Sequence, residues 1–156
     1  VCADAARLPL ADASVDFVFS NLMLQWTLPP DPVFAAVAAA LRAEGLFLFS
    51  TLGPDTLREV RRAWAAVDDA VHVNAFMDMH DIGDGLVQAG FHAPVMDVEH
   101  ITLTYPDARS ALRDLRGVGV RNVNSGRSGG LTGRRRWQAF LEAWDAQEVD
   151  GRVPLT

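Results

Sequence analysis

The pattern of hydrophobic positions predicts two buried strands in the N-terminal third of the chain. Residues Val15–Ser20 (VDFVFS) form a mostly apolar run of β-branched and aromatic side chains, and Leu46–Leu52 (LFLFSTL) form a second one. Short runs that are apolar almost throughout are typical of parallel strands, which are covered on both faces.

A helix is predicted between these two strands. Asp31 is expected to cap it, Pro32 suits its first position, and Gly45 is expected to end it. Its apolar face consists of residues at helical spacing, namely Val33, Phe34, Val37 and Leu41. A strand, a helix and a strand in this order predict a βαβ unit in a parallel sheet, and therefore an α/β fold.

The remaining pattern predicts four more helices and one strand. A helix is expected to start near Pro54 or Asp55, with Leu57, Val60 and Trp64 facing inward, and another to occupy Asp78–Gly90, capped by Asp78 and ended by Gly90. Its inward positions are Ile82, Leu86 and Val87. Val95–Tyr105 alternates between apolar and polar residues, which favours a strand with one exposed face or at a sheet edge. The last two helices are predicted over Pro106–Arg116 and Thr132–Gln147, joined by a loop rich in glycine and serine over Gly117–Gly130.

Several single residues can be assigned from the same pattern. Four aromatic residues lie at helical spacing and are expected in the core, namely Trp64, Trp137, Phe140 and Trp144. The only cysteine, Cys2, falls at the presumed end of a strand, where we expect it to be buried and inert. Asp150-Gly151 indicates a turn that leads into another element.

Composition narrows the class of protein. The chain has 156 residues, of which 49% are hydrophobic and 22% charged, as expected for a globular domain with a sizeable core. No apolar run approaches the roughly 20 residues of a membrane span, and a single cysteine is typical of a reducing compartment. We therefore expect a cytoplasmic protein without a membrane partner. Both ends of the chain look cut, so a longer domain is expected.

The charge is unevenly distributed. The net charge is -6, yet residues 109–136 hold eight arginines against one aspartate. Three of these arginines, Arg134, Arg135 and Arg136, fall in the first turn of a predicted helix, where positive charge opposes the helix dipole. This placement indicates that a partner outside the helix uses them. The acidity of the remaining chain argues against nucleic acid as that partner.

The first fifty residues are the most informative stretch of the sequence. VCADAARLPLADASVDFVFSN (residues 1–21) resembles the class I S-adenosylmethionine-dependent methyltransferases, in which an acidic and a small residue end one strand and a loop of the type L-P-[FL]-x-D-x-S-[FV]-D leads to the next. The resemblance implies a partial Rossmann-like sheet, namely the C-terminal half of the fold, with a helical substrate-side insertion. The implied division is 1–104 for the methyltransferase half, 105–150 for a basic helical insertion or lid, and 151–156 for the start of a truncated segment.

The resemblance also implies a cofactor site. Ligands of open α/β sheets lie beyond the carboxyl ends of the strands. There Asp4 would accept a hydrogen bond from the adenine amine of S-adenosylmethionine, the Ala5 N–H would donate to a ring nitrogen, and Asn21 with Leu22 would face the methionine part. The alternative for Asp4 is an ordinary loop-capping carboxylate. For Asp12 and Asp16 we favour turn formation and solvation.

Further motifs narrow the resemblance. SNLMLQW (residues 20–26), FSTLGPDTLRE (residues 49–59), HVN with MHD, and LTGRR (residues 131–135) are similar to the malonyl-carrier-protein O-methyltransferases of biotin synthesis. Such enzymes methylate the free carboxylate of a malonyl thioester, on a carrier protein or coenzyme A. The glycine-rich loop, the ribose-binding acid and the last strand of that family are not in this sequence, so the chain alone is expected to be inactive.

The implied reaction needs little acid–base chemistry. A malonyl carboxylate has a pKa near 4 and is ionised at neutral pH, so no general base is expected and the catalytic residues stay unassigned. The planar guanidinium group of arginine is best suited to bind a carboxylate. The candidates are Arg113, Arg116 and Arg121. Trp26 either lines the substrate site or packs in the core.

The triplet Arg134–Arg136 is the candidate surface for an acidic carrier protein. The four histidines lack metal-ligand spacing, so no metal is predicted, and His80 is expected at the surface.

Two other readings stay open. The arginine hydroxylases that help assemble respiratory complex I share the SNL-x-L-x-W and DG-x-VP patterns, and a fragment without the glycine-rich loop could be a non-catalytic binding module. The sequence does not determine the oligomeric state, for which a monomer is the working expectation.

Overall fold

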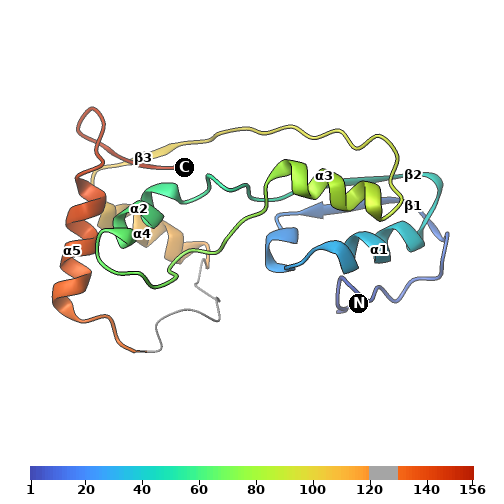
Figure 1. Cartoon of the computed structure of the whole chain (residues 1–156), viewed down its shortest axis with the longest axis horizontal. Helices are drawn as coiled ribbons and strands as arrows, with labels where there is room; N and C mark the ends of the chain where they lie inside the picture. The colour runs from blue at the N-terminus through green and yellow to red at the C-terminus, as the bar shows by residue number, and fades with distance from the viewer. Residues whose placement is uncertain (120–129) are drawn as a thin grey trace. The chain divides into compact units, whose positions relative to one another are not determined.

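Two parallel strands form the centre of the first of the two units into which the chain divides (Figure 1). The computed structural model describes residues 1–119 and 130–156. The first unit contains residues 1–54 and 76–98, and the second contains 55–75 and 99–156. The domain boundaries predicted from the sequence, at residues 104 and 150, do not coincide with the boundaries of these two units. That division stays a prediction.

The predicted βαβ unit is confirmed. β1 (Val15–Asn21) and β2 (Leu41–Ser50) pair in parallel, with Phe17–Asn21 opposite Leu46–Ser50. α1 (Asp31–Ala40) connects them. Strands of this type end at the same edge of a sheet, so Asn21 and Ser50 lie side by side at the carboxyl edge.

The ends of α1 differ from the prediction. Asp31 is the first helical residue rather than the cap, because Pro30 takes the cap position without a side-chain bond. The helix ends at Ala40 and not at Gly45, because the N–H groups of Ala13 and Ser14 donate to the last helical carbonyls at 2.8 and 2.9 Å. Gly45 instead permits a close backbone approach, because a Cβ at this position would lie only 2.9 Å from the Arg42 carbonyl oxygen.

α3 (Met79–Gln88) has the predicted start and stop signals. The Asp78 carboxylate accepts a hydrogen bond from the His80 N–H at 2.8 Å. At the other end Gly90 has a φ of 95°, and the N–H groups of Gly90 and Phe91 donate to Val87 and Leu86 carbonyls, both at 3.0 Å. This is the paired bonding of a Schellman cap. Val87 is 57% exposed, so its predicted inward position is wrong.

One face of the strand pair carries the core of the first unit. Val18, Phe47 and Phe49 pack against a cluster formed mainly by α1 and α3, whose members are Leu24, Val33, Phe34, Val37, Leu41, Ile82 and Leu86. Gly85 permits the close packing of these two helices, because a Cβ there would lie 3.1 Å from the Phe34 ring. The other face is open, with four side chains at least half exposed, namely Phe17, Phe19, Leu46 and Leu48.

In its described residues, the second unit consists of three helices and a short strand pair. The helices are α2 (Arg58–Ala65), α4 (Ala108–Gly117) and α5 (Arg134–Asp145), and β3 (Leu103–Tyr105) pairs antiparallel with β4 (Val153–Leu155). α2 packs on α5 through aromatic rings, with Trp64 stacked on Phe140 at a centroid distance of 4.2 Å. Of the four predicted core aromatics, Trp137 is only half-buried and the others are buried.

Three local predictions are wrong. The strand expected over Val95–Tyr105 is limited to β3, because only these three residues find a pairing partner in the described chain. Cys2 is exposed and lies in an irregular segment rather than a strand. The second predicted helix begins at Arg58, since Leu57 has a φ of 58° and precedes it in a left-handed conformation. The loop predicted over 117–130 lies largely outside the described residues.

Candidate functional site

A hydrogen-bonded network ties the carboxyl ends of β1 and β2 together. The Ser50 hydroxyl donates to Asn21 Oδ1 at 2.5 Å, and the Leu22 N–H donates to the Ser50 carbonyl oxygen at 3.1 Å. Leu22 has a φ of 48°, a conformation that is unfavourable for leucine. Strain of this kind is concentrated at functional sites, and here it turns the chain sharply at the strand end.

The turn after β1 is held by a second set of contacts. A 3-10 helix, η1 (Leu24–Trp26), follows the strand, and Gln25 Nε2 donates to the Leu22 carbonyl oxygen at 2.6 Å. The Thr51 hydroxyl donates to Gln25 Oε1 at 3.4 Å. Asn21 is exposed, and its amide nitrogen has no partner in the described part of the chain. The network therefore fixes Asn21 through its oxygen, and the described residues leave its two amide N–H donors unused.

The loop that contains Asp4 also presents unused polar groups. Asp4 Oδ1 accepts a hydrogen bond from the Ala6 N–H at 2.9 Å, and the Asp4 carbonyl oxygen accepts from the Arg7 N–H at 2.9 Å. The Asp4 side chain is exposed. Neither its Oδ2 atom nor the Ala5 N–H has a hydrogen-bond partner among residues 1–119 and 130–156. Asp4 thus caps its loop and still offers an acceptor beside a donor.

Both segments adjoin one hydrophobic cluster. Ala5, Ala6 and Leu8 pack against the cluster that includes Leu24 of η1. At the end of β1, the Ser20 hydroxyl is buried without a hydrogen-bond partner in the described structure. Buried polar groups normally have a partner in the protein or in ordered water, so Ser20 is an exception at the strand end.

Asp12 and Asp16, the other two aspartates of the N-terminal motif, have structural roles. Asp16 Oδ2 accepts from Arg42 at 2.6 Å, an exposed ion pair next to the start of β2. Asp12 is exposed within the turn that precedes β1. The placement of Asp12 agrees with the role in turn formation and solvation that the sequence favours. Asp16 is exposed as expected, but it lies in β1 and pairs with Arg42 instead of forming a turn.

Trp26 lies at the surface of the first unit. It is the last residue of η1, and it is 53% exposed. A purely structural packing role therefore does not fit Trp26, while its substrate role stays a prediction.

The predicted arginines belong to the second unit. Arg113 and Arg116 lie exposed on α4, and Arg121 falls outside the described residues. Arg134, Arg135 and Arg136 occupy the first turn of α5, as predicted. Arg136 binds the Asp68 carboxylate directly, which gives it a structural partner, whereas Arg134 and Arg135 are exposed without one in the described chain.

Asp68 is strongly stabilised as an anion. Burial raises the pKa of its carboxyl, but hydrogen bonds from Arg136, His72 and the Ala70 N–H outweigh burial and lower the pKa to about 2. His72 Nε2 lies 2.8 Å from Asp68 Oδ1, and its ring stacks on Trp64 at a centroid distance of 3.7 Å. Part of the basic segment is therefore used inside the second unit.

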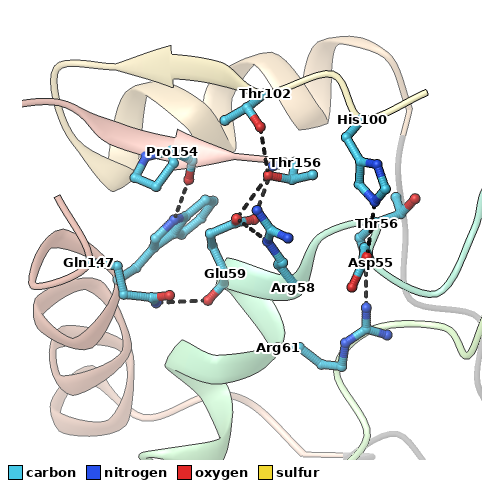
Figure 2. Close-up of polar contacts among 11 residues, drawn as sticks. Asp55, Thr56, Arg58, Glu59, Arg61, His100, Thr102, Gln147, Pro154 and Thr156 are labelled. Atoms are coloured by element: carbon cyan, nitrogen blue, oxygen red, sulfur yellow. Dashed lines mark hydrogen bonds and ion pairs between the residues drawn. The ribbon is translucent and has the colours of Figure 1, made fainter. Parts of the chain in front are cut away.

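A buried carboxylate joins α2 to the C-terminal strand, as Figure 2 shows. Glu59 is 4% exposed and accepts hydrogen bonds from Arg58 Nε at 3.0 Å, the Thr156 N–H at 3.0 Å and the Thr156 hydroxyl at 2.9 Å. Burial raises the pKa of Glu59, but these bonds together hold it below its ordinary value. No local pattern in the sequence predicts a role for this carboxylate, because its partner Thr156 lies 97 positions away.

The network at the strand ends was also missed in part. Asn21 was predicted, but Ser50, Gln25 and Thr51 were not. The signal was present: Ser50 ends the second strand just as Asn21 ends the first, and the same edge rule applies to both.

The N-terminal third of the chain is similar to a known protein family. Residues 1–49 match the family described as "Methyltransferase domain". The parallel βαβ unit confirms the predicted α/β fold class, and the match shows that residues 1–49 are similar to methyltransferase domains.

Individual relatives narrow the class. The chain is 53% identical over 156 residues to the malonyl-[acyl-carrier protein] O-methyltransferase of Laribacter hongkongensis, 51% to that of Gallionella capsiferriformans and 49% to that of a Methylovorus species. All of this chain is covered, but only 52%, 54% and 53% of those proteins, so the chain spans about half the length of these curated relatives. The predicted resemblance to these enzymes is confirmed, and the hydroxylase alternative finds no support.

A solved structure adds no further argument. An S-adenosylmethionine-dependent methyltransferase from Mesorhizobium loti matches 75% of this chain and 60% of that chain at 17% identity, with a TM-score of 0.42. This likeness is too slight to establish a shared fold. In the described residues, no helix has the length and apolar character needed to cross a membrane, and no three potential ligand side chains of His, Cys, Asp or Glu gather into a metal site.

Proposed function

We propose that the protein methylates the free carboxylate of a malonyl thioester on acyl carrier protein, using S-adenosylmethionine, as a step of biotin biosynthesis in the cytoplasm. The observation that carries this proposal is the 53% identity to the Laribacter hongkongensis enzyme over all 156 residues of the chain. Because the chain spans about half of that relative, the proposal concerns the protein as a whole.

The unused groups of the first unit fit the cofactor. Asp4 Oδ2 is an acceptor for the adenine amine, and the neighbouring Ala5 N–H is a donor for a ring nitrogen. The free amide of Asn21 and the backbone of Leu22 are the groups for the methionine part. S-adenosylmethionine, when bound, supplies an electrophilic methyl group on a sulfonium sulfur.

The chain does not need to supply a base for this reaction. A malonyl carboxylate, with a pKa near 4, is already ionised at neutral pH. The residues around the site then have to orient the carboxylate and exclude water, which lowers the barrier without proton transfer. The half-exposed Trp26 is the candidate for the wall that excludes water.

Arginines of the second unit are proposed to hold the substrate. Arg113 and Arg116 are exposed on α4, so each can bind the malonyl carboxylate through its planar fork. Arg134 and Arg135 are exposed in the first turn of α5 and suit the acidic surface of a carrier protein. Arg136 contributes less free charge, because Asp68 binds it.

Product analysis tests this function. The protein, incubated with S-adenosylmethionine and malonyl carrier protein, is expected to form the methyl ester, which mass spectrometry detects as a modified thioester. Acetyl carrier protein, which has no free carboxylate, is the control and is expected to stay unmodified. Malonyl-CoA in a parallel reaction shows whether the carrier protein is required. Hydroxyarginine in a protein substrate, or no methylation of any malonyl thioester, would contradict the proposal.

A further inference from the structure

A cavity of about 590 Å³ lies within the second unit, near the Glu59 carboxylate. Three arginines line it, Arg58 and Arg62 from α2 and Arg152 from the turn before β4, together with the hydroxyl-bearing residues Thr102 and Thr104. A volume of this size lies within the range of small-molecule sites. Part of its lining, including Arg58, Glu59 and Thr102, is drawn in Figure 2.

A tight turn positions Arg152. The N–H and carbonyl groups of Val149 and Arg152 bond each other at 2.8 and 3.0 Å, and the two residues between them, Asp150 and Gly151, have φ values of 52° and 71°. Asp-Gly with both φ angles positive is typical of a type I′ turn, which joins antiparallel strands without strain. The backbone of Arg152 is therefore held in place.

The guanidinium of Arg152 is fixed as well. Its Nε donates to the Thr104 hydroxyl oxygen at 2.9 Å and its Nη2 to the Thr104 carbonyl oxygen at 2.7 Å. These two bonds use two of the five N–H groups, so three stay available to a ligand. The Thr104 hydroxyl accepts from Arg152, and its own proton can be donated into the cavity. Preorganised donors of this kind bind an anion at a low entropic cost.

Arg62 provides a second, unengaged cation. It lies one helical turn beyond Arg58 on α2, it is exposed, and its side chain has no hydrogen-bond or ion-pair partner in the described part of the chain. Arg58 differs, because its Nε is bound to Glu59.

The charges in the lining favour a single negative charge. Three guanidinium groups stand against two carboxylates, and one of these, Glu59, is already bound by Arg58 and Thr156. The other, Asp150, has no partner among the described residues and can accept hydrogen bonds from a ligand. The site therefore suits a monoanion that carries N–H or O–H donors close to its charge.

We propose that this cavity binds the phosphodiester and adjoining amide chain of a phosphopantetheine arm, with Arg62 and Arg152 on the phosphate. The inference rests on the proposed function, since a carrier protein presents its malonyl group on such an arm. A phosphodiester carries one negative charge, and the hydroxyl and amide groups next to it provide donors for Asp150. Arginine forks match the phosphate oxygens in a bidentate manner.

Calorimetric titration of the protein tests the cavity without methyl transfer. The phosphopantetheine probe is the methyl phosphodiester of 4′-phosphopantetheine, which carries one negative charge as the arm on a carrier protein does. The second probe is pantetheine, which lacks the phosphate group. We expect phosphopantetheine to bind at least tenfold more tightly, and Arg62→Gln to remove most of this difference. Arg62 has no structural partner, so this variant leaves the fold intact. Arg152→Gln is expected to have the same effect, and Arg109→Gln, an exposed arginine on α4 outside the lining, is the control.

The outcomes separate this inference from the proposed function. Equal affinity of the unaltered protein for both probes would overturn the phosphate site, and so would an affinity difference that Arg62→Gln leaves unchanged. Binding of malonate in an Arg62-dependent manner without binding of phosphopantetheine would show a carboxylate site instead. Retained phosphopantetheine binding in a protein that methylates no malonyl thioester would contradict the function and leave the cavity assignment standing.

Discussion

Trp144→Ala is expected to lower the free energy of unfolding of the second unit by about 4 kcal/mol. Trp144 is fully buried in α5, packs against Phe140 at a centroid distance of 5.7 Å, and donates its indole N–H to the Pro154 carbonyl oxygen at 3.2 Å. The substitution leaves a large cavity and a buried carbonyl oxygen without this donor. Both effects act in the same direction, because packing contacts and a hydrogen bond are lost together.

Urea unfolding followed by far-ultraviolet circular dichroism measures this loss. The matched control is Trp137→Ala, the same substitution in the same helix at a half-buried position, for which about 1–2 kcal/mol is expected. Equal losses for the two variants would contradict the assignment of Trp144 to the centre of the second unit.

Glu59→Ala is expected to destabilise the protein by about 3 kcal/mol. The carboxylate is 4% exposed and binds Arg58 and two donors of Thr156, so its removal leaves these donors without an acceptor. The control is Glu142→Ala, an exposed glutamate on α5, which should change stability by less than about 0.5 kcal/mol. A loss for Glu59→Ala as small as that of the control would contradict its role as a link to the C-terminal strand.

The same carboxylate predicts a pH dependence. The hydrogen bonds of Glu59 hold its pKa in the folded protein below the ordinary value of 4.5, although burial acts in the opposite direction. Its contribution to stability is therefore fully present above that ordinary pKa and is lost as the pH falls through the folded-state pKa. Glu59→Gln, which cannot ionise, should show a smaller loss of stability as the pH is lowered from 6 to 3, a range that extends about 1.5 units on either side of the ordinary pKa of 4.5. An identical pH profile for both proteins would contradict this expectation.

Local signals in the sequence were enough to predict the βαβ unit. The runs around Phe17 and Phe47 are apolar almost throughout, and they become the two parallel strands. Asp78 and Gly90 mark the ends of α3 because a carboxylate cap and a left-handed glycine act within one helical turn. Such signals depend only on neighbouring residues, so a single sequence contains them in full.

The errors come from contacts between distant residues. α1 ends at Ala40 because the N–H groups of Ala13 and Ser14 bind its last carbonyls, and no local pattern announces those bonds. Val95 alternates with polar residues as a strand would, but the segment has a pairing partner only from Leu103 onward in the described chain. Tertiary pairing decides both cases, and propensity alone does not.

The candidate site likewise contains one residue that local signals predict and others that depend on contacts between distant residues. Asn21 was predictable, because the end of a parallel strand can be located from its apolar run and ligands lie at that edge. Its fixing by Ser50 depends on the register of β1 against β2. The cavity around Arg152 depends on bonds to Thr104 across 48 positions, and nothing in the basic segment of residues 109–136 points to it.

The dissociation constant of S-adenosylmethionine for variants of Asp4 tests the central claim most directly. Asp4→Asn keeps an Oδ1 acceptor for the Ala6 N–H but replaces the free Oδ2 by an amide that cannot accept from the adenine amine. Calorimetry on the whole protein should show about tenfold weaker binding for Asp4→Asn and at least that for Asp4→Ala, which corresponds to about 1.4 kcal/mol. Asp12→Ala, in the same exposed loop, should bind as the unaltered protein does. Unchanged affinity in both Asp4 variants would show that this carboxylate only shapes its loop and that the adenine site lies elsewhere.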